Sequence, residues 1–348
     1  MAALVVGATR RLTGYERVLI YRFDQDWHGQ AVAEDRVEDW EHSLRDIRFP
    51  ASNIPAQARA LYVKTPMRWM PERDVEQVAI AVCPIWAASR ADGATIDLSF
   101  AWLRSFSPVH KEFHASMGVD GSMSLSLLQD GRLWGLVVCH HRQAHHPFPV
   151  QRLAAMALAD AFSLCVSAAE QVGVDAARRA DMLKLNALLA HMAAAEDVDS
   201  ALTSGAVTIA NLFAAAGAAV LHDAELVLVG QTPPSDAVHA LADWLRRRGG
   251  EVFHTDRLAS LYPEWATHVV GASGVLAVFL SPERGDMLIW FRGAETQSVS
   301  WGGNLLRPEG SPLARHTFER WTEQRHGCLL YTSPSPRDRQ KSRMPSSA

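Results

Sequence analysis

The chain has 348 residues, a formal net charge of −4 at pH 7, 48% hydrophobic residues and 4 cysteines. This length predicts two domains of roughly 100–200 residues each, and the apolar fraction suffices for folded cores, which excludes a wholly disordered chain. The slight acidic excess gives no reason to expect nucleic acid as the main partner. The sparse, widely spaced cysteines indicate reduced thiols in a cytoplasm rather than a disulfide framework.

The sequence pattern carries no signal for secretion or membrane insertion. Its N-terminus lacks the succession of basic, apolar and small residues that marks a signal peptide. The longest apolar runs, such as residues 271–280, fall short of the ~20 residues that a membrane helix needs. We therefore expect a cytoplasmic protein that does not bind a membrane.

Residues 1–148 have the pattern of a first domain that mixes helices and strands. A helical spacing of Leu4, Ala8 and Leu12 leads directly into an apolar strand at residues 17–23. This direct succession leaves no room for an earlier domain. We therefore expect the front of the chain to be truncated.

The rest of this domain is predicted to consist of strands around one helix. A strand is expected at residues 29–34, and a helix after Pro55, because proline is favourable in a first helical turn, where its missing N–H is not needed. Strands at residues 122–128 and 133–140 are joined by Gln-Asp-Gly-Arg at 129–132. Asp-Gly between two apolar runs is a strong signal for a β-hairpin.

Residues 149–196 predict a long connecting helix, which Gly173 could bend. One apolar face of its first half consists of Leu153, Ala157, Ala161 and Leu164. Its second half has the spacing of a coiled coil, at Met182, Leu185, Leu189 and Met192. Helices of this kind connect domains or pair with a second copy, so we expect a homodimer formed through this helical spine.

Residues 197–327 predict a second compact domain, and no internal repeat is present. The expected elements are helices at 198–215 and 236–248 and strands at 218–222, 225–229, 275–280 and 286–292. The composition then changes at residues 328–348, which are rich in serine, proline and basic residues. We interpret them as an artefactual or disordered tail, and a basic tail that binds an acidic partner is the alternative.

Two segments of the first domain are suited to hold a ligand. Residues 50–62 form a loop with two prolines that feeds a helix, a construction that can place backbone carbonyls against a ligand. Ser122 and Ser124 alternate on a strand and therefore share one face. Their hydroxyls together with Arg104 suit a carboxylate. A surface arginine and two ordinary strand serines are the equally open alternative.

Cys139, His140, His141, His145 and His146 together suggest a metal site. Strand alternation opposes this interpretation, because His140 must face away from Cys139 and His141, and no carboxylate is near in sequence to orient the imidazoles. We therefore predict no metal, solvated loop histidines at 145 and 146, and a His140 that faces a ligand. The sequence also lacks a Gly-x-Ser-x-Gly elbow, a phosphate-binding loop and a dinucleotide fingerprint, so no catalytic machinery is expected.

Several motifs occur in one order along the first domain: Tyr21-Arg-Phe-Asp, His28-Gly, residues 50–62, residues 103–110, Met117-Gly-Val, Ser122-Met-Ser and residues 130–136 before Cys139-His-His. This series resembles the chromophore-binding GAF domain of bacterial phytochromes. In the second domain, residues 288–292, 301–303 and 314–321 resemble the hairpin tongue of the phytochrome PHY domain, which we expect at about 287–321. The resemblance covers residues 4–327 and implies an α+β fold of two GAF-like antiparallel-sheet domains, 1–148 and 197–327, joined by the helical spine.

The resemblance implies a linear tetrapyrrole, biliverdin, in the first domain. Its propionates would be held by Tyr62, Arg68, Arg104, Ser122 and Ser124. His110 would lie over the inner pyrroles and order a water molecule, and His140 would hydrogen-bond the carbonyl of the terminal D ring. Tyr21, Phe49 and Phe113 would line the space in which that ring rotates. The main-chain carbonyl of Asn53, followed by Ile54 and Pro55, would accept from the pyrrole nitrogens, and Arg315 of the tongue would meet the Asn53 side chain.

Three departures from the family pattern affect these expectations. Asn53 replaces an aspartate, and an amide gives a weaker contact to Arg315 than a carboxylate does, so we expect altered photoconversion. Ala314 and Thr317 replace a proline and a serine of the tongue motif. The cysteine that attaches the bilin is missing, since Val109 precedes His110 and no cysteine matches the other family position. Binding by this chain is therefore expected to be noncovalent.

The resemblance implies a red/far-red photoreceptor module that is not itself an enzyme. Family members usually end in a signalling enzyme, so we expect that a longer parent carries a histidine kinase that acts on a response regulator. A light-insensitive GAF sensor for haem or a nucleotide is the main alternative. A metal-dependent hydrolase built on residues 139–146 is a further one.

Overall fold

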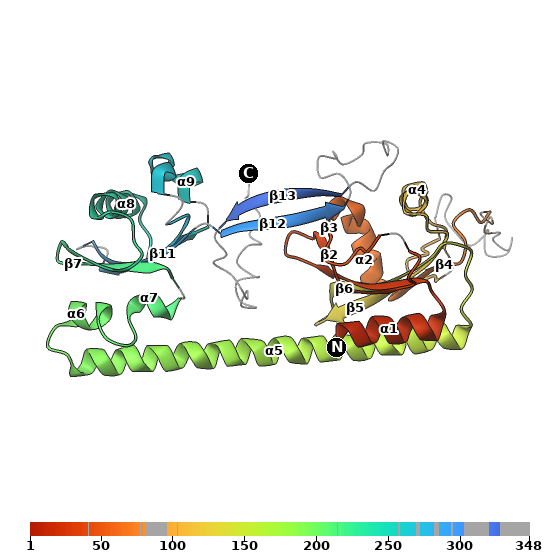
Figure 1. Cartoon of the computed structure of the whole chain (residues 1–348), viewed down its shortest axis with the longest axis horizontal. Helices are drawn as coiled ribbons and strands as arrows, with labels where there is room; N and C mark the ends of the chain where they lie inside the picture. The colour runs from red at the N-terminus through yellow and green to blue at the C-terminus, as the bar shows by residue number, and fades with distance from the viewer. Residues whose placement is uncertain are drawn as a thin grey trace. The chain divides into compact units, whose positions relative to one another are not determined.

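A computed structural model of the chain describes residues 1–302, apart from 41, 77, 79, 81–95, 103, 214, 257, 269–271, 282–284 and 294, and also the backbone of 320–327. The chain divides into two compact units. One contains Met1–Ala169 and Val299–Glu323, and the other contains Glu170–Ser298 and Gln324–Ala348. Each unit packs helices on a mainly antiparallel sheet (Figure 1), which confirms the predicted α+β class.

The sheet that contains the strands of the first unit has the order β13-β12-β3-β2-β1-β6-β5-β4, of which β12 and β13 lie only partly in that unit. Its strands are β1 (Arg17–Phe23), β2 (Gly29–Arg36), β3 (Arg48–Phe49), β4 (Met67–Met70), β5 (Gly121–Gln129), β6 (Arg132–His141), β12 (Glu295–Gly302) and β13 (Arg320–Gly327). The predicted β5–β6 hairpin is confirmed, and it turns at Asp130 and Gly131, whose φ angles of 50° and 73° suit Asp-Gly. Near the other end, β12 pairs in parallel with β3 at Trp301 and Arg48.

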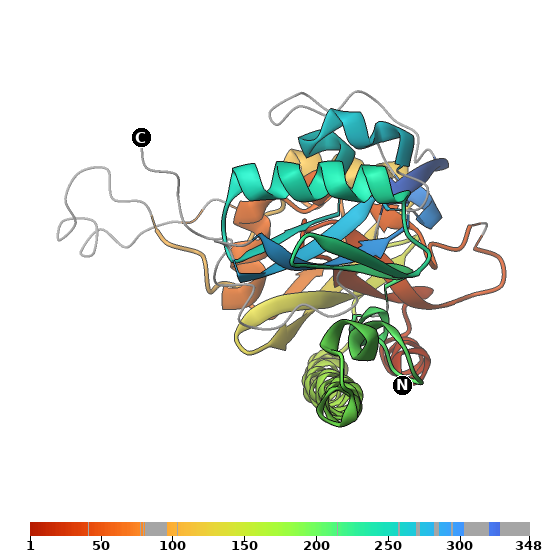
Figure 2. The same cartoon turned by 90° about the vertical axis from the view of Figure 1, so that its left-hand side faces the viewer.

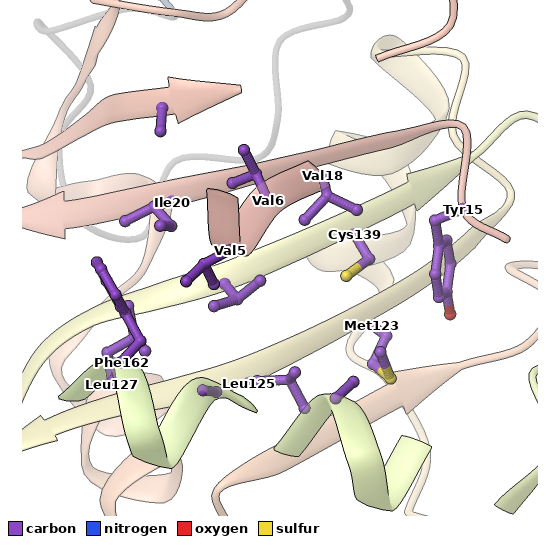
Figure 3. Packing of buried hydrophobic residues seen from close by; sticks show 14 of the residues in the cluster. Val5, Val6, Tyr15, Val18, Ile20, Met123, Leu125, Leu127, Cys139 and Phe162 are labelled. Carbon is purple, nitrogen blue, oxygen red and sulfur yellow. The ribbon is translucent and has the colours of Figure 1, made fainter. Parts of the chain in front are cut away.

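One face of this sheet is covered by α1 (Ala2–Thr13) and by the first turns of α5 (Pro149–Ala194) (Figure 1). Gln151 Nε2 of α5 donates to the carbonyl of Leu12 in α1 at 2.9 Å. Figure 3 shows the apolar cluster between these helices and the strands, to which Val18, Met123 and Cys139 contribute. Alternation along the strands therefore sends their other residues to the opposite face.

The predicted apolar residues of α5 share one face, and that face points away from the sheet. In α1, Leu12 packs against the core but Leu4 does not. Leu4 is 75% exposed, and α1 instead buries Val5 and Val6. Leu164 of α5 is 74% exposed, whereas Ala155, Ala159 and Phe162 pack against the sheet. The helix continues through Gly173 without a break.

By length and composition, α5 is the one helix of the described residues that could cross a membrane, with a mean hydropathy of 1.5 in its most apolar window. The sequence-based expectation missed it because polar residues such as Asp160 interrupt its apolar runs. Only 17% of that window is buried, although Ala155, Ala159 and Phe162 pack on the sheet of the first unit.

The sheet of the second unit has the order β8-β7-β11-β10-β9. Its strands are β7 (Gly217–His222), β8 (Glu225–Gly230), β9 (Val252–Thr255), β10 (Gly274–Ser281) and β11 (Asp286–Arg292). Figure 2 shows α8 (Ser235–Arg248) on one face and α6 (Val198–Thr203), α7 (Ile209–Leu212) and the end of α5 on the other. The short helices α9 (Leu258–Leu261) and η2 (Pro263–His268) complete the first of these layers.

Three predictions for this unit need correction. Residues 198–215 do not form one helix, because the chain turns at Gly205, whose φ is 93°. The strand β9 was not predicted. Residues 287–292 belong to β11, which is paired between β7 and β10, and so they are part of the sheet rather than of a hairpin tongue. The following hairpin strands are β12 and β13.

Candidate functional site

The face of the first sheet opposite α1 and α5 carries the predicted polar residues. On β6, His140 lies opposite Arg17 of β1 and Ser122 of β5. In the next row, Ser124 of β5 lies opposite Arg68 of β4. Strand alternation and the register between the strands thus bring these side chains to one surface, of which alternation alone predicted the shared face of Ser122 and Ser124. We call this surface the site face, and its residues are Arg17, Leu19, Tyr21, Arg68, Ser122, Ser124 and His140.

A pair of arginines makes one end of the site face cationic. The guanidinium of Arg68 lies 4.5 Å over the ring of Phe106, and its Nη1 is buried without a hydrogen-bond partner. Burial, and then the charge of Arg104, lower the pKa of Arg68 to about 10. Arg104 donates from Nη1 to the carbonyls of Leu98 and Ser99 at 3.1 and 2.9 Å. In the described part of the chain neither guanidinium has an acidic partner, and two guanidinium groups side by side suit an anion.

Hydroxyl groups lie beside these arginines. Tyr62, on α2 (Ala56–Lys64), is buried, and burial raises the pKa of its phenol although a hydrogen bond with Ser124 opposes the shift. Ser126 Oγ donates to the carbonyl of Tyr62 at 2.7 Å and so ties α2 to β5. Ser122 is buried in the adjacent row. The combination of guanidinium and neutral hydroxyl donors suits a carboxylate.

Three histidine rings form a row between β6 and α4 (Pro108–Ser116). His110 stacks on Phe106 at 5.4 Å, and its ring lies 4.2 Å from that of His114. His114 in turn meets His140 edge-on at 5.6 Å. Burial lowers the pKa of all three imidazoles, to about 4 for His114. They are therefore neutral hydrogen-bonding groups at pH 7. Phe113 is half-buried beside this row.

Aromatic side chains form the other end of the site face. The ring of Tyr21 lies 5.2 Å from Phe23 and 5.5 Å from Phe49, and all three are buried. Burial raises the pKa of the Tyr21 phenol far above its ordinary value. The structure thus brings Tyr21 and Phe49 together, whereas Phe113 lies on α4 with the histidines.

The Tyr21 ring occupies the space that a side chain at Gly29 would need. A Cβ on Gly29 would overlap the ring and the hydroxyl of Tyr21. We therefore expect Gly29→Ala to displace Tyr21 and to lower the free energy of unfolding by about 1–3 kcal/mol, measured by urea denaturation. Gly173→Ala is the matched control, because Gly173 has open space in α5, and it should stabilise the chain by about 0.5–1 kcal/mol. A Gly29→Ala variant as stable as the unaltered chain would contradict this packing.

The loop before α2 carries a second buried polar atom without a partner, Nδ2 of Asn53. Its backbone is held by Arg59, whose Nη1 donates to the carbonyl of Ile54 at 2.6 Å, and more weakly to that of Ala51 at 3.3 Å. The Arg59 guanidinium also lies 4.7 Å over the ring of Trp27. The helix α2 begins directly after Pro55, its N-cap residue, as predicted. Arg59 was not identified from the sequence.

The strand β12 brings Trp301 against this loop. Trp301 is fully buried, and its ring meets that of His28 at 5.1 Å. The Nδ1 of His28 accepts from the backbone N–H of Ala51 at 3.2 Å, which connects Trp301 with the Asn53 loop. Arg315, predicted to reach the same loop, lies outside the described residues, as do Ala314 and Thr317.

The structure separates the residues of the suggested metal cluster. Cys139 is packed in the core under α1 and α5, and burial raises the pKa of its thiol. His141 and His145 stack on each other at 4.5 Å, away from His140 on the opposite face. Among the described residues, the one group whose potential ligand atoms lie within 4.8 Å of one another is His222, Asp223 and Asp286 in the second unit. A hydrolase built on residues 139–146 has no assembled centre.

Two residues of this region were not predicted from the sequence. Arg17 of β1 donates a hydrogen bond to His140 of the adjacent β6, and the ring of His114 lies between those of His110 and His140. The spacing of His110 and His114 by one helical turn was a signal for the second. For Arg17 the only signal was a charged residue at a strand position that alternation places inside.

Comparison with known families agrees with this architecture. The family model described as GAF domain matches residues 1–169, and that described as Phytochrome region matches residues 182–328. Together they account for most of the chain. The chain belongs to the phytochrome family. Phytochromes are red and far-red photoreceptors that carry a bilin chromophore.

Individual relatives are similar along nearly the whole phytochrome fragment. Cyanobacterial phytochrome B of Nostoc is 33% identical over 96% of this chain and 44% of that protein. A bacteriophytochrome of Pseudomonas aeruginosa is 34% identical over 92% of this chain and 44% of that protein. The chain thus spans less than half the length of these two curated relatives.

Solved structures show the same similarity. A bacteriophytochrome of the photosynthetic bacterium R. palustris matches with a TM-score of 0.77 and 31% identity, over 94% of this chain and 66% of that one. The photosensory core module of a Stigmatella aurantiaca phytochrome matches with a TM-score of 0.74 and 36% identity, with the same coverage of each chain.

Proposed function

We propose that this chain is a red/far-red photosensory module that binds a linear tetrapyrrole on the site face. The observation that carries the proposal is the half-buried guanidinium of Arg68, whose buried Nη1 has no hydrogen-bond partner while Arg104 adds a second positive charge nearby. A buried cation without a counterion is costly. The propionate groups of a bilin would supply that counterion.

Each end of the site face fits one part of such a ligand. Arg68 and Arg104, with the hydroxyls of Tyr62, Ser122 and Ser124, would hold the propionates. The neutral His110 ring would lie over the inner pyrroles, and His140 would hydrogen-bond the carbonyl of the terminal ring. Tyr21, Phe49 and Phe113 would surround that ring. The Asn53 loop, continued by Ile54 and Pro55, would face the pyrrole nitrogens, where the unpartnered Nδ2 marks a polar contact still to be made.

Biliverdin is the proposed ligand, and we propose that it binds without a covalent link. Of the two described cysteines, Cys139 lies on the opposite side of the sheet and Cys165 is exposed on α5. Neither is on the site face. When bound, the bilin supplies the absorption of red light and the isomerisation of a double bond. The protein residues hold its acid groups, keep its terminal carbonyl hydrogen-bonded and exclude water around the ring.

Signalling would involve the rest of a longer protein. We propose that light-driven changes at the Asn53 loop reach the tongue through Arg315 and pass along α5 to an output region, a histidine kinase that acts on a response regulator. Exposed apolar residues of α5, such as Leu164 and Leu183, suit a homodimer in the cytoplasm. The module itself would be a sensor and not an enzyme.

The decisive experiment is the absorption spectrum of the chain produced together with biliverdin. We expect a band near 700 nm in darkness and a reversible change after red light. Electrophoresis under denaturing conditions should release the pigment, because the link is noncovalent. Haem alone should give no stoichiometric complex. A chain that stays colourless in excess biliverdin, or that binds haem and ignores light, would overturn the proposal in favour of a light-insensitive GAF sensor.

A further inference from the structure

Arg17 and His140 form a buried pair on the site face. They lie directly opposite each other on β1 and β6, and their side chains are 2% and 4% exposed. Nε and Nη2 of Arg17 lie 3.2 and 2.9 Å from the same atom, Nδ1 of His140. The ring of Trp40 covers the guanidinium at 4.2 Å. The arginine is thus held in place by strand register, stacking and two donated hydrogen bonds.

This contact determines where His140 carries its proton. An arginine side chain has only N–H donors. Burial lowers the pKa of Arg17, but only to about 10, so it remains protonated at neutral pH. Nδ1 of His140 must therefore be the acceptor and carry no hydrogen. A neutral imidazole with a bare Nδ1 has its single proton on Nε2.

The surroundings keep this imidazole neutral. Burial, and then the charge of Arg17, lower the pKa of His140. The other titratable groups around the pair are His110 and His114 on α4, which lower the pKa of His140, and Glu34 and Arg36 on β2, which act on Arg17. The Glu34 carboxylate accepts from the N–H of Leu44 and does not replace Arg17 at His140.

We propose that Arg17 is a positioning residue that fixes His140 as a hydrogen-bond donor through Nε2–H. In the described part of the chain Nε2 makes no hydrogen bond, so this N–H is available to a ligand. The ligand group that meets it must be an acceptor. If the proposed function holds, that group is the terminal-ring carbonyl of the bilin, and Arg17 sets its recognition without touching it.

The first test uses the ligand-free chain, with nitrogen-15 in its histidines, and nuclear magnetic resonance to read the protonation of each ring nitrogen. We expect His140 to carry its proton on Nε2 alone from pH 6 to 8. Arg17→Met should shift His140 to a mixture of both tautomers and raise its titration midpoint, and Arg17→Lys should restore part of the preference. Arg22→Met is the matched control, because Arg22 is an exposed arginine on the same strand. It should change neither reading.

The tautomer result decides the proposal whether or not a bilin binds. A proton on Nδ1 in the unaltered chain would overturn it, even if Arg17→Met failed to fold. An Arg17→Met variant with unchanged tautomer and titration would do the same. A colourless chain with the expected tautomer would refute the proposed function but support the role of Arg17 at His140.

The second test measures the carbonyl of bound biliverdin by resonance Raman spectroscopy. We expect its stretching band to shift upward in Arg17→Met and in His140→Phe alike, since both remove a fixed donor, and to stay unchanged in Arg22→Met. A shift in His140→Phe without one in Arg17→Met would show that His140 donates without help from Arg17, and it would overturn the proposal.

Discussion

Replacement of Arg68 by methionine is expected to stabilise the ligand-free chain and to weaken its affinity for biliverdin by ~30-fold or more. The stability should rise by about 1 kcal/mol, because methionine fills similar space on the Phe106 ring without a partly buried charge. The affinity should fall because truncation of one partner in a buried charge pair costs about 2–5 kcal/mol. Thermal denaturation without ligand and titration with biliverdin, followed by absorbance, measure the two effects.

A rise in the stability of the ligand-free chain together with a fall in affinity for biliverdin distinguishes an arginine that binds the ligand from one that supports the fold. Arg104→Met is the comparison for the stability measurement alone, since Arg104 already donates to the carbonyls of Leu98 and Ser99, and its loss should lower the stability of the ligand-free chain. Arg68→Lys keeps the charge but not the planar pair of donors, so its affinity for biliverdin should lie between those of the unaltered chain and of Arg68→Met. If Arg68→Met lowered stability and left affinity unchanged, Arg68 would be part of the framework only.

Local patterns predicted the parts of the site that depend on local geometry. The alternation of a strand placed Ser122 and Ser124 on one face of β5, and it placed His140 and Cys139 on opposite faces of β6, because successive side chains point in opposite directions whatever the fold. The Asp130-Gly131 turn was predicted for the same reason, since it needs only two residues with positive φ. In each case the physical cause acts within a few residues.

Features that depend on distant partners were not predicted. Arg17 and His140 are 123 positions apart, and only the register of β1 on β6 makes them neighbours. Which side of α1 and of α5 packs on the sheet was not predicted, because both helices are apolar on several sides. Neither composition nor local pattern predicts that Arg68 and His140 lie on one surface. That expectation came from the resemblance to phytochromes.

A second large effect is expected from His114, whose buried imidazole makes the first unit sensitive to acid. Its pKa in the folded chain is about 4, mainly because of burial, against an ordinary value of 6.5. A lowered pKa contributes stability that is fully present above about pH 6.5 and is lost as the pH falls towards 4, because the unfolded chain takes up the proton first. This loss amounts to about 2 kcal/mol at pH 5. His110 and His140, with pKa values also lowered by burial, add to it with the same sign.

His114→Leu should therefore lose about 2 kcal/mol less stability between pH 7 and pH 5 than the unaltered chain does. At pH 7 the variant gives up one hydrogen bond, from Nδ1 to the carbonyl of His110, and gains apolar packing, so its stability there should change by less than about 1 kcal/mol. Hydrogen exchange of the α4 and β6 amides at the two pH values measures the first unit separately from the second.

His222→Gln in the second unit is the control, because the contribution of His222 to stability has the opposite dependence on pH. A hydrogen bond to Asp199 raises the pKa of His222, so its contribution is complete below the ordinary histidine pKa and is lost as the pH rises through the raised value. Removal of His222 should lower the protection of the β7 amides from hydrogen exchange more at pH 5 than at pH 7. By contrast, His114→Leu should raise the protection of the α4 amides most at pH 5. Equal acid sensitivity of α4 in His114→Leu and in the unaltered chain would mean that His114 is not a buried neutral imidazole. The row from His110 to His140 would then be open to water, and its rings could not present fixed hydrogen bonds to a ligand.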